Sequence, residues 1–311
     1  MDRSKHLLRL RDWNTERILS VIENAARLKD EVKLGKYSEQ LKGKTIGMFF
    51  EKQSLRTITT FQVGMHQLGG MPVMLAPEGI GVNKRECLKD IARCLSRWVN
   101  GLVVRCYEQS LVEQFAEHCS IPIINALTNN YHPCQALAFG QTCFELFGGN
   151  LKGKTIAFIG DGNNVANSIM ALCAKTGMNF TLACPKGFEQ ETEEVNSILP
   201  EFEKFGTKYK VFNTPEEGVK NADIVYTDVW ISMGQEALKS TKQNHFLQFQ
   251  VNDALLKQAP AHHKVIHCLP ANRGEEITDS VMDNLQINLS YEEAENRLHA
   301  QKAVLLELLQ N

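Results

Sequence analysis

The regular alternation of short apolar runs with longer amphipathic segments is the feature that most constrains the fold of this chain. In the first part, residues 44–50, 72–75, 101–105 and 121–125 each form an apolar run next to helix-like segments. Strands separated by helices can pair in parallel, because the crossover lets the chain return to the same edge of the sheet. The sequence therefore predicts a parallel α/β sheet.

The alternation restarts after an amphipathic helix expected over 135–148. Further strands are expected over 154–159, 179–183 and 209–212, with two more that end at Asp228 and Leu269. The other helices are expected over 13–34, 54–68, 86–99, 111–119, 164–176, 189–205, 215–220 and 291–309. A chain of 311 residues is also longer than one hydrophobic core usually supports, which is about 250–300 residues. We therefore expect two α/β domains, joined near 135–150.

Composition argues against several classes of protein. The net charge is -2, with 43% hydrophobic and 23% charged residues, which gives no reason to expect a nucleic-acid or membrane surface. No apolar run reaches the roughly 18 residues of a membrane span, and the first residues lack the order of a signal peptide. The nine cysteines include no C-x-x-C pair, which argues against a disulfide framework and a thiolate zinc site and favours a reducing cytoplasm.

Polar residues follow the predicted strand that ends near Tyr226. The segment 227–234 holds a lone carboxylate, Asp228, together with hydroxyls and a glycine. Open α/β sheets bind ligands at the carboxyl ends of their strands. A carboxylate there can pair with an ammonium group, which indicates a site for a cationic or zwitterionic small molecule. An Asp that only caps the strand is the alternative.

The segment 50–57 joins a predicted strand to a predicted helix. Ser54, Arg56 and Thr57 stand at the start of that helix, where free backbone N–H groups and the helix dipole favour an anion. The segment is not a P-loop, because G-x-x-x-x-G-K-[ST] is absent. A serine-capped helix with a solvated arginine is the alternative.

Two further segments could complete such an anion site. Arg105 ends a predicted apolar strand, where it could give a forked contact to an oxyanion or form an ion pair. His132 precedes, and Gln135 follows, the proline that opens the joining helix. We expect no metal, because no H-E-x-x-H motif or His pair at ligand spacing is present.

The remaining candidates lie in the second half of the chain. Residues 160–164 superficially resemble a dinucleotide-binding turn, but Val165 stands where the pattern needs a third glycine, so NAD is not expected. Cys268 could be a nucleophile, or it could line a pocket with the backbone of Leu269. Arg297 could be a surface charge or a donor in the pocket.

Together these segments resemble the aspartate/ornithine carbamoyltransferase family over residues 41–299. The motifs are F-E-K at 50–52, S-x-R-T at 54–57, A-R-x-L-S-R at 92–97, H-P-C-Q at 132–135, D-V-W-I-S-M-G at 228–234 and H-C-L-P at 267–270. Each motif is weak alone, but all of them in order are specific. The resemblance implies two doubly wound parallel-sheet α/β domains, with the C-terminal helix packing back on the N-terminal domain.

The resemblance also implies a reaction, in which the carbamoyl group of carbamoyl phosphate passes to the δ-amine of L-ornithine and no cofactor takes part. Residues 1–134 with 291–311 would bind carbamoyl phosphate, and residues 135–290 would bind ornithine. The family forms trimers with active sites at subunit interfaces. We therefore expect a homotrimer, or a multiple of trimers, in the cytoplasm.

The roles of individual residues follow from the same resemblance. The phosphate would be held by Ser54, Leu55, Arg56 and Thr57. The carbamoyl group would be held by Arg105, His132, Gln135, Arg297 and the carbonyl groups of Cys268 and Leu269. The amino-acid end of ornithine would be held by Asn164, Asp228, Ser232 and Met233. Arg105 and His132 would stabilise the oxyanion, and Cys268 with Asp228 would orient the amine.

Three places depart from the family pattern. Leu55 and Ile58 stand where Thr and Arg are usual, and Phe139 stands where Asp is usual. Gly81 occupies the position from which a Gln often reaches the neighbouring subunit, and residues 84–85 could replace it as a cationic arm. We expect weaker carbamoyl-phosphate contacts, by about 1.5–3 kcal/mol for one lost charge-assisted bond, and reduced sensitivity to phosphate-mimicking inhibitors.

Two other functions stay open. A carbamoyltransferase for another amine, such as putrescine, fits the same motifs, although Asp228 and the Ser-Met-Gly loop suit an amino acid better. A catalytically silent paralogue with a binding or regulatory role fits the changes at 55, 58 and 81. Citrulline formation from carbamoyl phosphate and a panel of amines distinguishes the three.

Overall fold

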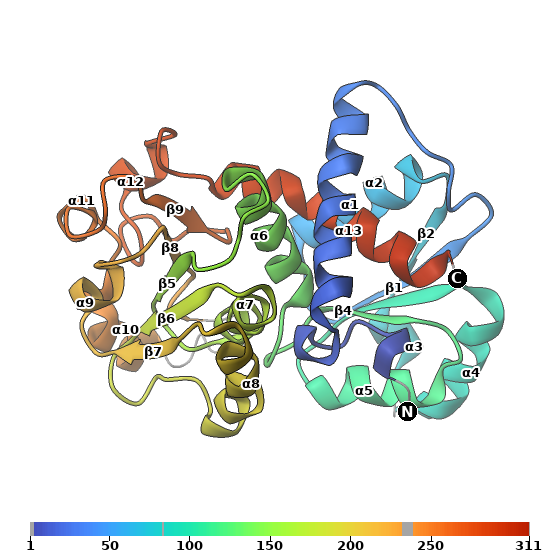
Figure 1. The fold of residues 1–311 in the computed structure, drawn as a ribbon. Helices are drawn as coiled ribbons and strands as arrows, with labels where there is room; N and C mark the ends of the chain where they lie inside the picture. The colour runs from blue at the N-terminus through green and yellow to red at the C-terminus, as the bar shows by residue number, and fades with distance from the viewer. Residues whose placement is uncertain (1–2, 83, 232–238, 311) are drawn as a thin grey trace. The chain divides into compact units, whose positions relative to one another are not determined.

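The chain divides into two compact units, each built around one parallel sheet (Figure 1). The computed structural model describes residues 3–82, 84–231 and 239–310. Unit 1 comprises Met1–Gln141 and Glu295–Asn311, and unit 2 comprises Thr142–Ala294. The expectation of two parallel-sheet α/β domains is confirmed.

The sheet of unit 1 has the strand order β2-β1-β3-β4, with every neighbouring pair parallel. Its strands are β1 (Thr45–Phe50), β2 (Met71–Leu75), β3 (Gly101–Arg105) and β4 (Ile123–Leu127). The accompanying helices are α1 (Thr15–Lys33), α2 (Leu55–Gln67), α3 (Pro77–Ile80), α4 (Leu88–Trp98), α5 (Gln109–His118) and the first part of α6 (Pro133–Leu146). The central strands β1 and β3 are almost wholly buried, as expected for strands covered on both faces.

The helices α4 and α5 pack onto this sheet through one apolar cluster. In α4, Leu88, Ile91, Ala92 and Leu95 are buried at the spacing of a single helix face. They join Phe115 of α5, whose ring centroid lies 5.6 Å from that of Phe49 in β1. The apolar residues that recur at helical spacing thus form the contact that holds both helices on the sheet.

The last helix, α13 (Ser290–Leu309), belongs to unit 1 from Glu295 onward. Its Glu307 accepts a hydrogen bond from Arg17 Nε of α1 at 2.8 Å, and its Lys302 donates to Gln67 of α2 at 3.0 Å. A glycine at position 64 allows the close approach, because an added Cβ would lie 3.1 Å from the Lys302 side chain. The C-terminal helix therefore packs back on the N-terminal unit, as the resemblance implies.

The sheet of unit 2 has the strand order β7-β6-β5-β8-β9, again with every pair parallel. Its strands are β5 (Thr155–Ile159), β6 (Asn179–Ala183), β7 (Tyr209–Phe212), β8 (Ile224–Thr227) and β9 (Lys264–His267). Its helices are α7 (Asn164–Thr176), α8 (Thr192–Phe205), α9 (Pro215–Val219), α10 (Lys239–Phe246), α11 (Asp253–Leu256) and α12 (Asp279–Asp283). Short 3-10 turns occur at Arg3–Lys5, Leu10–Asp12 and Leu247–Phe249.

Some boundaries differ from the expected ones. The strand expected over 121–125 lies at Ile123–Leu127, since Pro122 has no N–H to give to the sheet. The helix expected from 189 begins at Thr192. The sequence analysis did not identify α3, α10, α11 and α12, because helices of four to eight residues carry little 3.6-residue periodicity.

The structure also describes the state of the cysteines and the character of the helices, which the composition raised. All nine cysteines are free thiols, and only Cys87 is exposed while Cys94 is half-buried. Across the described ranges, no helix has both the length and the apolar character that crossing a membrane requires.

The short helix α9 packs on its sheet through a glycine. A Cβ added at Gly218 would lie 2.6 Å from the Cβ of Ala183 in β6 and 3.3 Å from Ile159 Cδ1 in β5. Because backbone or core groups must move to make room, Gly218→Ala is expected to destabilise the chain by about 1–3 kcal/mol. Denaturant unfolding measures the change. The matched control is Gly79→Ala in α3, where the added Cβ makes only an ordinary contact of 3.9 Å and stability is expected to be kept.

Candidate functional site

The two sheets each have one point at which the strand order reverses, and the candidate residues gather at those points. In unit 1 the reversal lies between β1 and β3, where Phe50 is the register partner of Arg105. Parallel sheets bind ligands at the carboxyl ends of the strands beside such a reversal. The loop that follows β1 and leads into α2 therefore emerges next to Arg105.

The start of α2 presents free N–H groups. Ser54 caps the helix in an extended conformation, and its Oγ accepts a hydrogen bond from the Thr57 N–H at 3.2 Å. No acidic residue stands in the first turn, so the positive end of the helix dipole is not neutralised locally. Leu55 is 79% exposed. Because its side chain has no polar atom, Leu55 can contribute only backbone groups to an anion at this helix end.

Arg297 of α13 connects the start of α2 with α6. It is 3% exposed, and its Nη2 donates to Thr57 Oγ1 at 2.9 Å. Its Nη1 donates to Gln135 Oε1 of α6. Arg297 is therefore a buried donor, and the alternative of a surface charge is wrong.

Three guanidinium groups act on one buried histidine. The pKa of His132 lies well below 6.5 because of burial and of the positive charges of Arg297, Arg105 and Arg56. Burial and the charges of Arg297 and Arg56 likewise lower the pKa of Arg105 to about 10. Burial and mutual repulsion of these groups therefore both disfavour their charged forms, and a bound anion would relieve the repulsion. We call these four residues the arginine cluster.

In unit 2 the strand order reverses between β5 and β8, where Ile159 and Thr227 are register partners. Asp228 follows β8 and is buried, with 8% of its surface exposed. Its Oδ2 accepts a hydrogen bond from Asn163 Nδ2 at 2.8 Å, and its Oδ1 accepts from the Val229 N–H at 2.8 Å and from the Cys268 thiol at 2.7 Å. A thiol that donates to a carboxylate is not a thiolate nucleophile, so this geometry favours an orienting role for Cys268.

Asn163 is a site residue that the sequence analysis missed. Its Oδ1 caps α7 by accepting from the N–H groups of Val165 at 3.0 Å and Ala166 at 3.1 Å, while its Nδ2 holds Asp228. Asn164, the residue expected to touch ornithine, is the buried first residue of α7. The preference of Asn for the N-cap position was the available signal.

Gly162 shows why the loop after β5 looks like a dinucleotide turn. A Cβ there would lie 2.6 Å from the backbone nitrogen of Gln190 and 2.8 Å from the carbonyl carbon of Glu189. The Gly162 N–H also donates to the Phe188 carbonyl at 2.9 Å. The glycine is explained by packing of two backbone segments, without a bound pyrophosphate.

A buried polar network holds the loop after β9. The Leu269 backbone is left-handed, with φ of 57°, and its N–H donates to His267 Nδ1 at 2.8 Å. The opposite nitrogen, Nε2, then carries the proton and donates to Glu276 Oε1 at 2.9 Å. His267 and Glu276 are both fully buried. Glu276 was missed because it sits in a loop without any periodic or motif signal.

The expected site residues thus fall into two groups, one in each unit. Ser54, Leu55, Arg56, Thr57, Arg105, His132, Gln135 and Arg297 lie in unit 1, and Asn164, Asp228, Cys268 and Leu269 lie in unit 2. Ser232 and Met233 lie outside the described residues. Among the residues that are described, no group of three or more His, Cys, Asp or Glu side chains is arranged to hold a metal ion.

Comparison with known proteins also divides the chain into two parts, although the C-terminal helix is matched together with the second part. Residues 5–145 match the aspartate/ornithine carbamoyltransferase carbamoyl-P binding domain, and residues 152–308 match the Asp/Orn binding domain of that family. The chain belongs to the aspartate/ornithine carbamoyltransferase family.

Individual relatives cover nearly the whole chain. The ornithine carbamoyltransferase of Halalkalibacterium halodurans is 44% identical over 307 residues, which is 99% of this chain and 96% of that protein. That of Archaeoglobus fulgidus is 42% identical over 305 residues, which is 98% of this chain and 97% of that protein. The solved structure of the ornithine carbamoyltransferase from Pyrococcus furiosus is 40% identical, with a TM-score of 0.94 over 98% of this chain and 96% of that one.

The low pKa of His132 predicts a dependence of stability on pH. Below pH 6.5 the unfolded chain protonates this histidine while the folded chain does not. The unfolded state then binds more protons, so the free energy of unfolding falls with decreasing pH, by at most about 1.4 kcal/mol per pH unit from this residue. His132→Gln is expected to remove this part of the slope. Urea unfolding from about pH 5 to pH 8 measures it, with His118→Gln as the matched control in the same unit. Equal slopes for wild type and His132→Gln would contradict the prediction.

Proposed function

We propose that this chain transfers the carbamoyl group of carbamoyl phosphate to the δ-amine of L-ornithine, giving L-citrulline and phosphate. The observation that carries the proposal is the arginine cluster: Arg56, Arg105 and His132 lie in the segment that matches the carbamoyl-P binding domain, and Arg297 donates hydrogen bonds to Thr57 and Gln135 of that segment. The relatives that cover nearly the whole chain carry the name ornithine carbamoyltransferase, which supports ornithine as the acceptor.

In this proposal the phosphate lies against the start of α2. Ser54, Leu55 and Thr57 supply backbone N–H groups or hydroxyls, and Arg56 supplies charge. The helix dipole also stabilises the negative charge that the leaving phosphate carries. The Ser54 cap and the Arg297–Thr57 hydrogen bond support this placement of the phosphate, since they hold the start of α2 in place without a bound anion.

The carbamoyl oxygen is proposed to lie between Arg105 and His132. Attack by the neutral δ-amine forms a C–N bond and turns the carbonyl oxygen into a tetrahedral oxyanion, which Arg105 stabilises by charge. A neutral His132 can donate one hydrogen bond without adding a fourth positive charge. As the C–O bond to phosphate breaks, the bonding electrons leave with the phosphate, the carbonyl re-forms, and the extra proton of the amine passes to the departing phosphate. Gln135 and Arg297 complete the contacts to the carbamoyl group.

The amino-acid end of ornithine is proposed to bind at Asp228. Its carboxylate pairs with the α-ammonium group, while Asn164, Ser232 and Met233 hold the rest of that end. Cys268 and Asn163 keep the carboxylate in one orientation, and the buried His267–Glu276 pair supports the loop that carries Cys268 and Leu269. Orientation of two bound substrates supplies much of the rate in such a reaction.

We further propose a homotrimer, or a multiple of trimers, located in the cytoplasm. At Gly81 the backbone is left-handed, with φ of 61°, and an added Cβ would lie 3.0 Å from Arg85 Cβ. A glutamine in this conformation would be strained, which supports the expectation that residue 84 or 85, instead of residue 81, reaches the neighbouring subunit. Arg85 donates to the Gly79 carbonyl, and Lys84 is exposed. The weaker carbamoyl-phosphate contacts expected from Leu55, Ile58 and Gly81 also stay a prediction.

Steady-state kinetics with a panel of amines tests the function. With carbamoyl phosphate, L-ornithine is expected to give citrulline, while putrescine, which lacks an α-carboxylate and has no need of Asp228, is expected to be a poor acceptor. Arg56→Gln removes a charge-assisted phosphate contact of about 1.5–3 kcal/mol and should raise the KM for carbamoyl phosphate roughly tenfold or more. No turnover with any amine, in a protein that still binds carbamoyl phosphate, would favour the binding or regulatory paralogue.

Asp228→Asn tests the ornithine end separately. Loss of the charged partner of the α-ammonium should raise the KM for ornithine roughly 10- to 100-fold, with little change in the KM for carbamoyl phosphate. Asp223→Asn is the matched control, because Asp223 lies at the other end of β8 and accepts from the Thr155 N–H at 2.8 Å. An unchanged ornithine KM in Asp228→Asn would rule out this assignment.

A further inference from the structure

A buried ammonium group, that of Lys52, lies in the loop that leads from β1 into α2. Lys52 is 4% exposed and stands two residues before Ser54, the residue that caps α2. Moving an ammonium group out of water costs free energy unless other groups compensate for the lost hydration. The contacts of Lys52 therefore indicate what its burial achieves.

Two neighbouring loops of unit 1 compensate for this burial. Lys52 Nζ donates to Asn129 Oδ1 at 2.7 Å, and Asn129 lies in the loop after β4. The same nitrogen lies 4.2 Å from the ring centroid of Tyr107, in the loop after β3, which is within the range of a cation–π contact. Lys52 thus contacts two loops besides its own.

Three further hydrogen bonds join the same three loops. The Glu51 N–H donates to the Arg105 carbonyl at 2.8 Å. The Tyr107 N–H donates to Glu51 Oε2 at 3.3 Å, and the Tyr107 carbonyl accepts from the Asn129 N–H at 2.9 Å. Together with the Lys52–Asn129 bond, these contacts form a closed cycle that runs through the loops after β1, β3 and β4.

The loop after β4 leads directly to His132. Its Thr128 N–H donates to the Tyr131 carbonyl at 2.9 Å, and the Tyr131 N–H donates to Thr128 Oγ1 at 3.1 Å. Because this turn is closed and His132 follows it at once, a group that holds Asn129 also holds the backbone of His132. The cycle therefore connects the residues proposed to bind phosphate with the histidine proposed to bind the carbamoyl oxygen.

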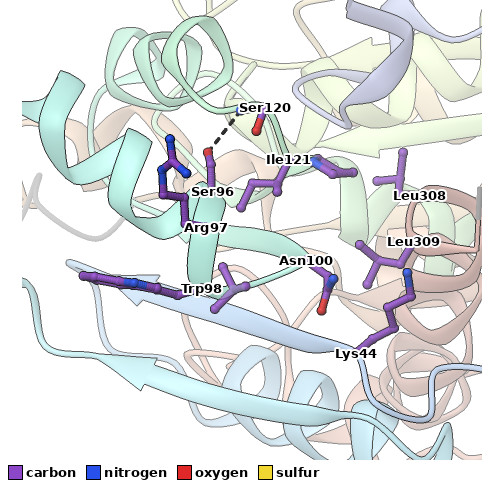
Figure 2. Close-up of a pocket in the computed structure, with 11 residues that line it drawn as sticks. Lys44, Ser96, Arg97, Trp98, Asn100, Ser120, Ile121, Leu308 and Leu309 are labelled. Carbon is purple, nitrogen blue, oxygen red and sulfur yellow. Dashed lines mark hydrogen bonds between the residues drawn. The ribbon is translucent and has the colours of Figure 1, made fainter.

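At the opposite edge of this sheet, where the strands begin, neutral side chains join the elements. Ser96 Oγ accepts from the Ser120 N–H at 3.1 Å, the bond drawn in Figure 2, and Asn100 Oδ1 accepts from the Thr45 N–H at 2.9 Å. Neutral hydrogen bonds thus suffice to hold elements of this sheet together. A buried ammonium group is costlier, and its place beside the loop that begins α2 points to a role in anion binding.

We propose that Lys52 is a positioning residue for carbamoyl phosphate, which holds the start of α2 and the loop before His132 at the spacing that the phosphate and the carbamoyl oxygen require. This role rests on the reaction proposed above. The ammonium group acts through Asn129 and Tyr107, while the contacts to the substrate are left to the residues named earlier. A misplacement of about 1 Å can lower a rate roughly 100-fold, so a side chain that only sets a spacing can matter to the reaction.

Steady-state kinetics of Lys52→Met tests this role. Methionine keeps an apolar stem but removes the charge and the donor, so the side chain no longer joins the two loops. We expect kcat/KM for carbamoyl phosphate to fall about 10- to 100-fold, while the KM for ornithine changes by less than about twofold. Lys52→Arg keeps a cation that can donate to Asn129 and lie over the Tyr107 ring, and it is expected to recover most of the lost kcat/KM.

Lys302→Met is the matched control. Lys302 is 2% exposed, and its Nζ donates to the side-chain amide of Gln67 at 3.0 Å, so the variant loses the same type of bond. Gln67 is the last residue of α2, at the opposite end of that helix from Ser54. Both variants are expected to lower the free energy of unfolding, but only Lys52→Met is expected to lower kcat/KM per folded molecule.

Changes at Asn129 test whether Lys52 acts through this partner. Asn129→Leu removes the acceptor and is expected to reproduce the kinetic loss of Lys52→Met. Asn129→Asp gives the ammonium group an ionised partner and is expected to keep the wild-type kcat/KM. In the double variant, the Asn129 change should add less than about twofold to the loss in Lys52→Met, because the two residues share one bond.

Calorimetric binding of carbamoyl phosphate is measured beside the kinetics, so that the reaction and the role of Lys52 can fail separately. Lys52→Met is expected to raise the Kd for carbamoyl phosphate about tenfold. A wild type that binds carbamoyl phosphate but forms no citrulline would overturn the reaction alone, and one that does not bind it would overturn both. Values of Kd and kcat/KM in Lys52→Met within about twofold of wild type, or equal losses in Lys302→Met, would overturn the role of Lys52.

Discussion

The convergence of Arg56, Arg105 and Arg297 on one buried histidine is the constraint on which the candidate site depends. Gathering like charges away from water costs free energy, and the lowered pKa of Arg105 expresses that cost. The fold tolerates it because the sheet, the start of α2 and α13 over-determine where these side chains lie. An anion with several oxygens bound among these guanidinium groups would attract each of them and so offset their mutual repulsion. The hydrogen bonds of Arg297 to Thr57 and Gln135 hold this arrangement in the unliganded chain.

Parallel strand order explains why both groups of residues arise where they do. Where the strand order reverses, the loops that follow two neighbouring strands turn in different directions and leave a crevice at the carboxyl ends of those strands. Each sheet contains one such reversal. Arg105 and the loop after β1 meet at the first, while Asp228 and the loop after β5 meet at the second. The two groups have opposite charge. Arginine side chains gather in unit 1, and the carboxylate of Asp228 stands at the reversal in unit 2.

The sequence predicted the parts of this arrangement that leave a local signal. Apolar runs predicted the central strands, and the residues directly after them, such as Arg105 and Asp228, followed from the general rule for parallel sheets. Arg297 stayed ambiguous because its burial depends on α13 returning to unit 1, a contact between distant parts of the chain. Asn163 and Glu276 escaped notice because their partners are set by tertiary packing. Short helices such as α11 escaped because one turn has no period.

The return of α13 to unit 1 has a consequence for the order of events during biosynthesis. Most of the cluster's residues leave the ribosome with the first 141 residues, but Arg297 follows only after all of unit 2 has been made. A nascent chain that has folded its first sheet therefore lacks the guanidinium that links Thr57 to Gln135. The arginine cluster is therefore complete only when translation is almost finished. Because unit 1 is discontinuous along the polypeptide, completion of this hydrogen-bonded link coincides with completion of the chain.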